Sequence, residues 1–372
     1  MGHLLNDGFG SILAPLLPFL IDRLDLSLAM AGLLGTTRIV TNSLMQPWLG
    51  HLADRVQRPS LVIIGPILTI TAMSLLGRAG SFPILILLMF VSGLGTALFH
   101  PVAASLVTVG VERRRGLLMA FFSSGGSFGG ALAPIVIVAY TQAFGLNRTP
   151  WLAIPGLLLV LAFAIPLRRV LPEAIRRTHA RFRLAHLPKR FFLLWTVIVL
   201  QSTTATAFST FLAVLVTQRE GSALAGGASI SAFLLTGAIG SFFAGNLSDR
   251  WGRKAVMLGS MLASTPLYLL FLHGPRIAVL PVIAVAGLFA LSATPVGVVA
   301  AQECLPGRTG LVSGLVMGLA WGVGGLALTP IGWLADRFGL IAVMSVVALL
   351  PLIGAIVFLF YRDAEETGRP SA

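Results

Sequence analysis

Four ionisable side chains lie within apolar stretches in the first half of the sequence: His3, Asp7, Arg38 and His100. An ionisable group inside a membrane costs from about 2.5 kcal/mol upward, so such a group is a candidate for function. The second half has only uncharged polar groups at comparable positions, namely Gln201, Ser202, Thr203, Thr204, Thr206 and Thr294. We therefore expect charge-based chemistry in the first half and uncharged polar contacts in the second.

Asp7 and His100 are predicted to lie at the same depth in the membrane. Asp7 aligns, through the internal repeat described below, with Ser202, which lies twelve residues after Arg190. His100 lies twelve residues before Glu112, and at 1.5 Å per residue both depths are roughly 18 Å. An imidazole and a carboxylate placed together can bind and release a proton, so we predict that Asp7 and His100 couple transport to protons. The alternative is a purely structural hydrogen-bonded pair.

Arg38 is expected ten residues inside the second apolar segment. Its guanidinium could bind a phosphonate or carboxylate with paired donors, or it could neutralise Asp7. The predicted substrate cavity is lined by residues from both halves, namely His3, Asn6, Arg38, Gln201, Ser202, Thr204 and Thr294.

Neither a metal site nor a cofactor is expected. The only cysteine is Cys304, and His179 and His186 have no carboxylate or cysteine at a metal-ligand spacing. The sequence also contains no Gly-Lys-Ser/Thr phosphate-binding loop, which argues against direct use of ATP and leaves a proton gradient as the expected energy source.

The composition is that of a membrane protein. Of 372 residues, 56% are hydrophobic and 10% are charged, whereas soluble domains carry about 25% charged residues. The mean hydropathy is +0.92. The net charge of +13 comes from basic residues in short breaks between apolar segments, so nucleic-acid binding is not expected.

Twelve helical spans are predicted, each close to the roughly 20 residues that cross a bilayer. They are 4–22, 29–53, 60–79, 82–108, 115–140, 150–168, 191–217, 228–248, 255–273, 277–303, 309–335 and 340–361. With both termini in the cytoplasm, 19 basic residues face inward and 6 face outward, which satisfies the positive-inside rule. We predict two six-helix bundles at 1–168 and 191–362, joined by a basic cytoplasmic linker at 169–190 and followed by a tail at 363–372.

The two halves carry an internal repeat with an offset of 194–195 residues. GHLADRVQRPSL begins at Gly50 and GNLSDRWGRKAV begins at Gly245. These motifs are predicted to form conformational latches between the halves through Gly50, Asp54, Arg55, Arg58, Gly245, Asp249, Arg250, Arg253 and Lys254. Asp336 and Arg337 resemble part of the motif but fall on the outer side, so we interpret them as an ordinary helix end.

Glycines recur at equivalent positions in spans five and eleven. Close helix packing is predicted at Gly126, Gly129, Gly130, Gly324 and Gly325, either as plain packing or with a role in rocking between the halves. The repeat also shows that Asn6 has only five residues before it, whereas its partner Gln201 lies eleven residues after Arg190. We therefore expect either a short first span or a true start upstream of Met1.

Along essentially its whole length, the chain resembles the major facilitator superfamily, in which parallel repeats form the two halves. Within it, the chain is similar to the fosmidomycin resistance group, through HLLND (His3–Asp7), FHP (Phe99–Pro101) and AQECLPGRTGLVSG (Ala301–Gly314). Members of that group often carry glutamate and arginine where this chain has Val102 and Ser105.

The resemblance implies a monomeric, multi-pass transporter of the bacterial inner membrane that is not an enzyme. It implies proton-coupled efflux, an antiport of a small molecule or drug by alternating access. The alternatives are a proton symporter that imports an organic acid or sugar and, more remotely, a membrane-embedded enzyme or sensor. The expected partners are the lipid bilayer and a small-molecule substrate.

Overall fold

The computed structural model describes residues 1–56, 61–107, 115–170, 188–305 and 312–361. Within these ranges every regular element is a helix and there is no strand. This confirms the predicted all-α membrane fold.

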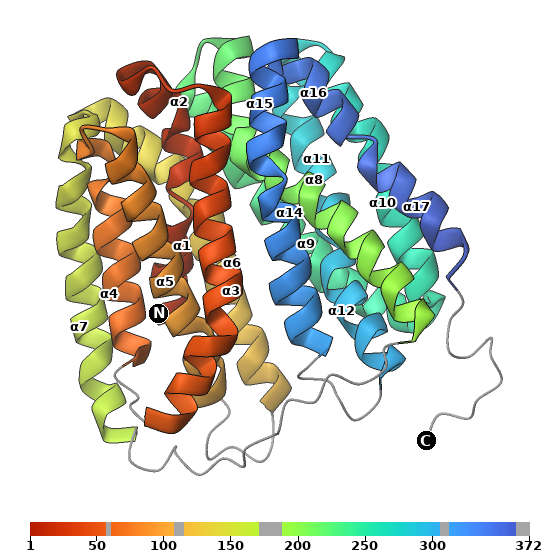
Figure 1. The fold of residues 1–372 in the computed structure, drawn as a ribbon, viewed down its shortest axis with the longest axis horizontal. Coiled ribbons are helices and arrows are strands. Elements are labelled where there is room, and N and C mark those ends of the chain that lie inside the picture. Colours follow the sequence, from red (N-terminus) through yellow and green to blue (C-terminus); the bar gives the residue numbers. More distant parts are fainter. Residues whose placement is uncertain (57–60, 108–114, 171–187, 306–311, 362–372) are drawn as a thin grey trace.

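The first half is built from long apolar helices with short connections (Figure 1). They are α1 (Gly2–Gly10), α2 (Leu13–Leu24), α3 (Leu28–Val56), α4 (Leu61–Ser74), η1 (Leu75–Arg78), α5 (Phe82–Val107), α6 (Arg115–Phe144), η2 (Leu146–Leu152) and α7 (Ala153–Val170).

The second half repeats this arrangement with more interruptions. Its elements are α8 (Lys189–Glu220), α9 (Ala223–Trp251), α10 (Arg253–His273), η4 (Arg276–Ala278), α11 (Val279–Ala290), α12 (Ala293–Cys304), η5 (Gly314–Ala320), α14 (Trp321–Leu326), α15 (Leu328–Phe338), α16 (Leu340–Val347) and α17 (Leu350–Leu359).

Eleven segments of the described chain are long and apolar enough to cross a membrane. They match eleven of the twelve predicted spans within a few residues. The remaining span is α3, which has 29 residues and at 1.5 Å per residue is roughly 43 Å long. Its middle is more polar because it carries Thr36, Thr37, Arg38, Thr41 and Asn42.

Two spans are interrupted where functional groups gather. The first span breaks between α1 and α2, where Ser11 Oγ donates a hydrogen bond to the Asp7 carbonyl at 2.8 Å. The eleventh span begins with a π-helical segment, η5, and breaks again at Ala327, between α14 and α15. Such π segments occur frequently at functional sites, because they widen the helix locally.

One arginine in each half holds the end of a neighbouring helix. Arg23 donates to the carbonyls of Gly77 and Ala79, and Arg219 donates to those of Phe271, Leu272 and Gly274. Carbonyls at a helix C-terminus lack helical partners and favour a nearby cation. These arginines are 196 residues apart, so the repeat extends to this cap, which the sequence analysis had not identified.

The two halves contact each other near the end of the bundle that carries Arg23 and Arg219. The distribution of basic residues predicts that this end faces outward. We call this the outer end, and the opposite one the inner end. There α3 packs against α14 and α15, and α6 packs against α9. A side chain at Gly32 would collide with the Leu328 carbonyl, so this glycine permits the close approach. The ribbons of the halves separate toward the inner end (Figure 1).

Candidate functional site

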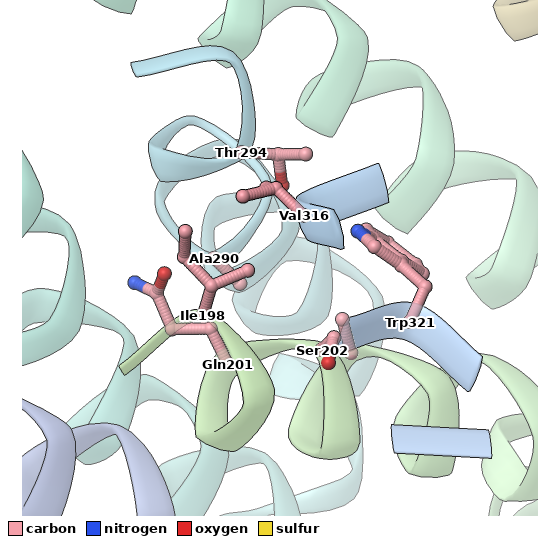
Figure 2. A pocket seen from close by; sticks show the side chains of 8 residues that line it. Ile198, Gln201, Ser202, Ala290, Thr294, Val316 and Trp321 are labelled. Atoms are coloured by element: carbon pink, nitrogen blue, oxygen red, sulfur yellow. The ribbon is translucent and has the colours of Figure 1, made fainter. Parts of the chain in front are cut away.

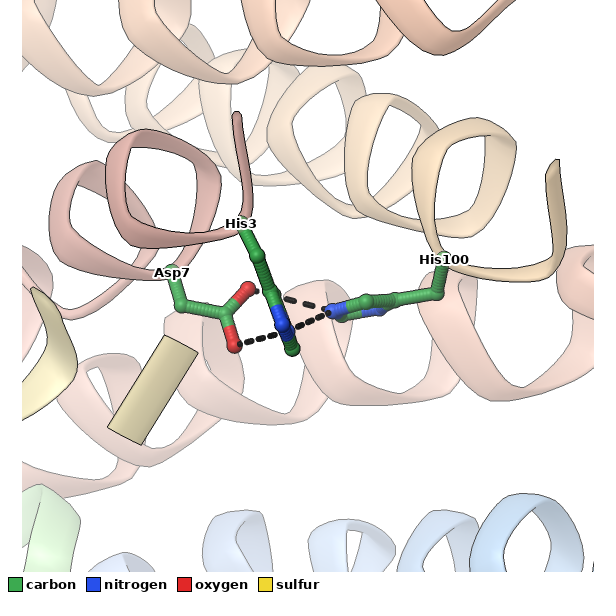
Figure 3. Close-up of side chains that lie close together, drawn as sticks. All are labelled: His3, Asp7 and His100. Carbon is green, nitrogen blue, oxygen red and sulfur yellow. Dashed lines mark hydrogen bonds and ion pairs between the residues drawn. The ribbon is translucent and has the colours of Figure 1, made fainter. Parts of the chain in front are cut away.

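Three of the predicted ionisable residues meet in one cluster, which we call the His–Asp–His cluster (Figure 3). His3 and Asp7 lie one turn apart on α1, and His100 lies on α5. Asp7 Oδ2 is 3.0 Å from His3 Nε2, and Asp7 Oδ1 is 3.1 Å from His100 Nε2. The two Nε2 atoms are 3.2 Å apart. The cluster includes the predicted pair of Asp7 and His100, and His3 joins it.

A second layer of contacts fixes the cluster. His3 Nδ1 lies 2.7 Å from the Phe122 carbonyl, and the His3 ring stacks on the Phe122 ring with centroids 4.1 Å apart. Asn6 Nδ2 donates to Asp7 Oδ1 at 3.0 Å, and Thr69 Oγ1 donates to Asn6 Oδ1 at 3.0 Å. Asn6 is fully buried, so the structure places this predicted cavity residue behind Asp7, where it orients the carboxylate.

The hydrogen-bond pattern favours a cation within the cluster. His3 Nδ1 must carry a hydrogen to bond the Phe122 carbonyl, which accepts but cannot donate. In the neutral ring, the Nε2 lone pair then faces Asp7 Oδ2 at 3.0 Å, and two acceptors at that distance repel each other. A proton or a metal ion between them would relieve this repulsion.

Glycines on α6 make room for the cluster. A side chain at Gly126 would place Cβ 2.5 Å from His3 Nε2 and 2.8 Å from Asp7 Oδ2. A Cβ at Gly129 would collide with the Leu4 carbonyl, whereas a Cβ at Gly130 would lie 3.3 Å from Ser11 Oγ. Gly126 and Gly129 therefore allow α1 and α6 to pack closely, as predicted.

The matching glycines of span eleven lie against both halves. A Cβ at Gly324 would be 2.6 Å from Ser202 Oγ, within the second half. A Cβ at Gly325 would be 2.5 Å from Ile39 of α3, in the first half. Close packing within a half and between the halves therefore depends on adjacent glycines.

Arg38 is near the cluster but forms no ion pair with Asp7. Its Nε lies 3.4 Å from Ser92 Oγ, a long hydrogen bond. A side chain at Gly10 would collide with the Arg38 guanidinium, so the break between α1 and α2 accommodates this group. Asp7 is paired with His3 and His100 instead. Direct neutralisation of Asp7 by Arg38 is thus not observed.

Three of the uncharged candidates of the second half line a separate small cavity of about 10 Å³ (Figure 2). Its lining includes Gln201, Ser202 and Thr294, together with Trp321, which sequence reasoning had missed. A cavity of this size holds about one water molecule. Thr204 is not among the lining residues. Its hydroxyl donates to the carbonyls of Leu200 and Val347.

The second latch motif makes its contacts within its own half. Arg253 pairs with Asp249 at 2.5 Å and with Glu303 at 3.2 Å. Lys254 Nζ donates to the carbonyls of Leu359 and Tyr361. Arg250 is exposed, and a side chain at Gly245 would meet open space. The side chains of the first motif, Gly50, Asp54, Arg55 and Arg58, lie outside the described part of the chain.

The interpretation of Asp336 as an ordinary helix end was wrong. Its two carboxylate oxygens accept hydrogen bonds from the backbone N–H groups of Leu28 and Ala29, at 2.7 and 2.9 Å. These are free donors in the first turn of α3, in the other half of the molecule. Asp336 therefore joins the halves at the outer end. The repeat-equivalent residue in the first half is Thr141, which cannot supply a carboxylate.

Comparison with known proteins shows which family has this arrangement. The Major Facilitator Superfamily profile matches residues 1–232 and again 194–372. The chain is 30% identical to the uncharacterized MFS-type transporter YfnC of Bacillus subtilis (strain 168), over 97% of this chain and 91% of that one. It is 29% identical to the fosmidomycin resistance protein of Escherichia coli (strain K12), over 96% and 90%.

Solved structures share the fold at low sequence identity. A bacterial homologue of the human lysosomal transporter Spinster, in an inward-facing and occupied conformation, matches with a TM-score of 0.83 and 16% identity, over 100% of this chain and 97% of that one. A D-xylose–proton symporter matches with a TM-score of 0.76 and 15% identity, over 97% and 95%. The two-part profile match, the near full-length relatives and the shared fold together show that the chain is a membrane transporter of the major facilitator superfamily.

Proposed function

We propose that this chain exports a small molecule across the bacterial inner membrane in exchange for protons, as a monomer with both termini in the cytoplasm. The observation that carries the proposal is the His–Asp–His cluster, in which the Asp7 carboxylate contacts two imidazole nitrogens and, within the described part of the chain, forms no ion pair with a lysine or arginine. Protons are the cations that imidazole and carboxylate groups exchange near neutral pH. The resemblance to a fosmidomycin resistance protein supports export over import.

Exchange requires that the cluster face the two sides of the membrane in turn. Asp336, Thr36 and the packed glycines join the halves at the outer end, and Thr36 Oγ1 donates to the Gly325 carbonyl at 2.8 Å. In the alternate state these contacts break, and the inner ends approach each other. Protons bind the cluster while it is open to the outside, and they are released inside when the inner end opens again. The substrate moves in the opposite direction.

Substrate recognition is assigned to groups near the cluster and to the second half. Among the described residues, Arg38 has one side-chain partner, a long hydrogen bond to Ser92, so its paired donors remain suited to an anionic substrate group. Gln201, Ser202, Thr294 and Trp321 supply uncharged polar and aromatic contacts. Arg38→Gln should therefore reduce transport of anionic substrates more than that of neutral ones. An equal loss would argue for a structural role of Arg38.

The proposal is tested in everted membrane vesicles energised with a proton gradient. Candidate substrates come from a susceptibility screen of an expressing strain, with and without an uncoupler. Asp7→Asn keeps the shape of the side chain but removes its charge, and it should abolish proton-driven accumulation. Asp25→Asn is the matched control, because Asp25 ends α2 in a left-handed conformation that asparagine also adopts. Full activity of Asp7→Asn would refute proton coupling at the cluster.

A further inference from the structure

The atoms of the His–Asp–His cluster have the mutual spacing of metal ligands. The two Nε2 atoms of His3 and His100 lie 3.2 Å apart, and the Asp7 carboxylate contacts both rings, with Oδ2 3.0 Å from His3 Nε2 and Oδ1 3.1 Å from His100 Nε2. In a tetrahedral zinc site with bonds of about 2.0–2.1 Å, neighbouring ligand atoms are about 3.3 Å apart. One ligand atom from each of the three residues lies within 4.8 Å of the other two, so a shift of the carboxylate would bring one Asp7 oxygen and both nitrogens to the spacing of one tetrahedral face. The sequence predicted no metal site, because nothing in it showed that His3 would join Asp7 and His100.

Two of the three ligands, His3 and Asp7, are also held in the required chemical form. Metal-binding histidines usually donate their other ring N–H to a carbonyl or carboxylate, which fixes the tautomer and directs the lone pair at the metal. His3 does this through Nδ1 and the Phe122 carbonyl. Asp7 is oriented by a hydrogen bond from Asn6, which in turn contacts Thr69. This second layer matches the support that metal sites use.

An ion could reach the site, where three protein ligands would leave its fourth position to water or a substrate group. The side chains of His3, His100 and Asp7 are 13%, 25% and 29% exposed, so none is sealed. A Cβ at Gly126 would lie only 2.5 Å from His3 Nε2, so the glycine keeps α6 from displacing the ligand atoms. Three protein ligands and one open position are the arrangement of zinc sites that also bind water or a substrate.

The ligand types select the class of ion. Two imidazole nitrogens and one carboxylate oxygen suit Zn²⁺, Co²⁺ and Ni²⁺, whereas Mg²⁺ and Ca²⁺ prefer oxygen ligands. One carboxylate balances only part of the +2 charge. The guanidinium of Arg38, close enough to interact electrostatically with Asp7, opposes binding.

We propose that His3, Asp7 and His100 form a binding site for one divalent transition-metal ion of the zinc class. Metal binding at this site requires no proton gradient, so this proposal can be tested independently of the proposed exchange. The ion enters from solution and takes water or a substrate group as its fourth ligand.

The test is equilibrium binding of Zn²⁺ to the purified full chain, carrying no polyhistidine tag, by calorimetry in detergent without a gradient. The wild type should bind one ion. Asp7→Asn and His100→Gln should each weaken binding at least tenfold, and Arg38→Gln should strengthen it. The control is His273→Gln, because His273 contacts Ser345 away from the cluster and its loss should leave binding unchanged.

A second measurement uses only the wild-type chain, so it remains informative if a variant fails to fold. X-ray absorption of the zinc-loaded wild type should show scattering from two imidazole rings. No binding by the wild type, or binding that persists unchanged in both Asp7→Asn and His100→Gln, would overturn the proposal. Binding that depends on His3 alone would assign the ion to the N-terminal amine and His3, and would overturn it as well.

Discussion

Asp336 is predicted to hold the outer end of the transporter closed, and Asp336→Ala should weaken that closure. The substitution removes two hydrogen bonds that the Asp336 carboxylate accepts from free N–H groups at the start of α3. Replacing a helix-capping residue by alanine costs about 0.5–2 kcal/mol. A negative charge at an exposed helix N-terminus contributes about 0.3–1 kcal/mol.

Asp336 is exposed, so solvent screens its charge, and we take about 1 kcal/mol as the loss. Because 1.4 kcal/mol corresponds to a factor of ten, the population of the outer-open state should rise about fivefold. Asp336→Asn keeps one acceptor oxygen and asparagine caps helices as well as aspartate does, so its effect should be clearly smaller.

The assay is cysteine labelling from the outer side with a membrane-impermeant maleimide. Cys304 is the only native cysteine, so Cys304→Ser provides a clean background. Leu328 is fully buried where the halves meet, and Leu328→Cys should react only when the outer end opens. Labelling should accelerate about fivefold with Asp336→Ala and remain unchanged with Asp22→Asn, an exposed acid of α2. Equal labelling of Asp336→Ala and its parent would show that Asp336 does not hold the halves together.

Three further predictions concern packing, capping and the substrate. Gly129→Ala should lower the stability of the folded chain by about 1–3 kcal/mol through its clash with the Leu4 carbonyl, measured by thermal unfolding, whereas Gly245→Ala, in open space, should not. Arg219→Met should lower the unfolding temperature because it removes charged hydrogen bonds worth about 1.5–3 kcal/mol each, whereas the exposed Arg276→Met should have no effect. Gln201→Ala should raise the Michaelis constant for substrate about two- to tenfold through one lost hydrogen bond, and the exposed Thr196→Ala on the same helix should not.

The spans and the pairing of Asp7 with His100 could be predicted because they depend on regular geometry. Apolar runs of about 20 residues define membrane helices, and a rise of 1.5 Å per residue converts sequence distance into depth. The depth of Asp7 in the membrane was taken from Ser202, the residue that aligns with it in the internal repeat. Asp7 and His100 were thus predicted at matched depths, and in the structure Asp7 Oδ1 lies 3.1 Å from His100 Nε2.

The remaining contacts could not be predicted because they depend on which way a helix face turns. Thr204 was grouped with Ser202 by sequence, yet two residues turn a helix by about 200°, and Thr204 faces Val347 rather than the cavity. Asp336 looked like a terminal charge because its partners are backbone groups of α3, which carry no sequence signal. Trp321 joins Gln201 only because spans seven and eleven pack together.

The central claim, exchange of substrate for protons, is tested most directly by the sign of a pH change. Proteoliposomes that enclose a pH-sensitive dye and the substrate are diluted into substrate-free buffer, so that substrate leaves down its gradient. Antiport predicts that the lumen acidifies in either orientation of the protein, and that Asp7→Asn abolishes the signal. Alkalinisation would show symport, and substrate efflux without a pH change would show that protons do not drive this transporter.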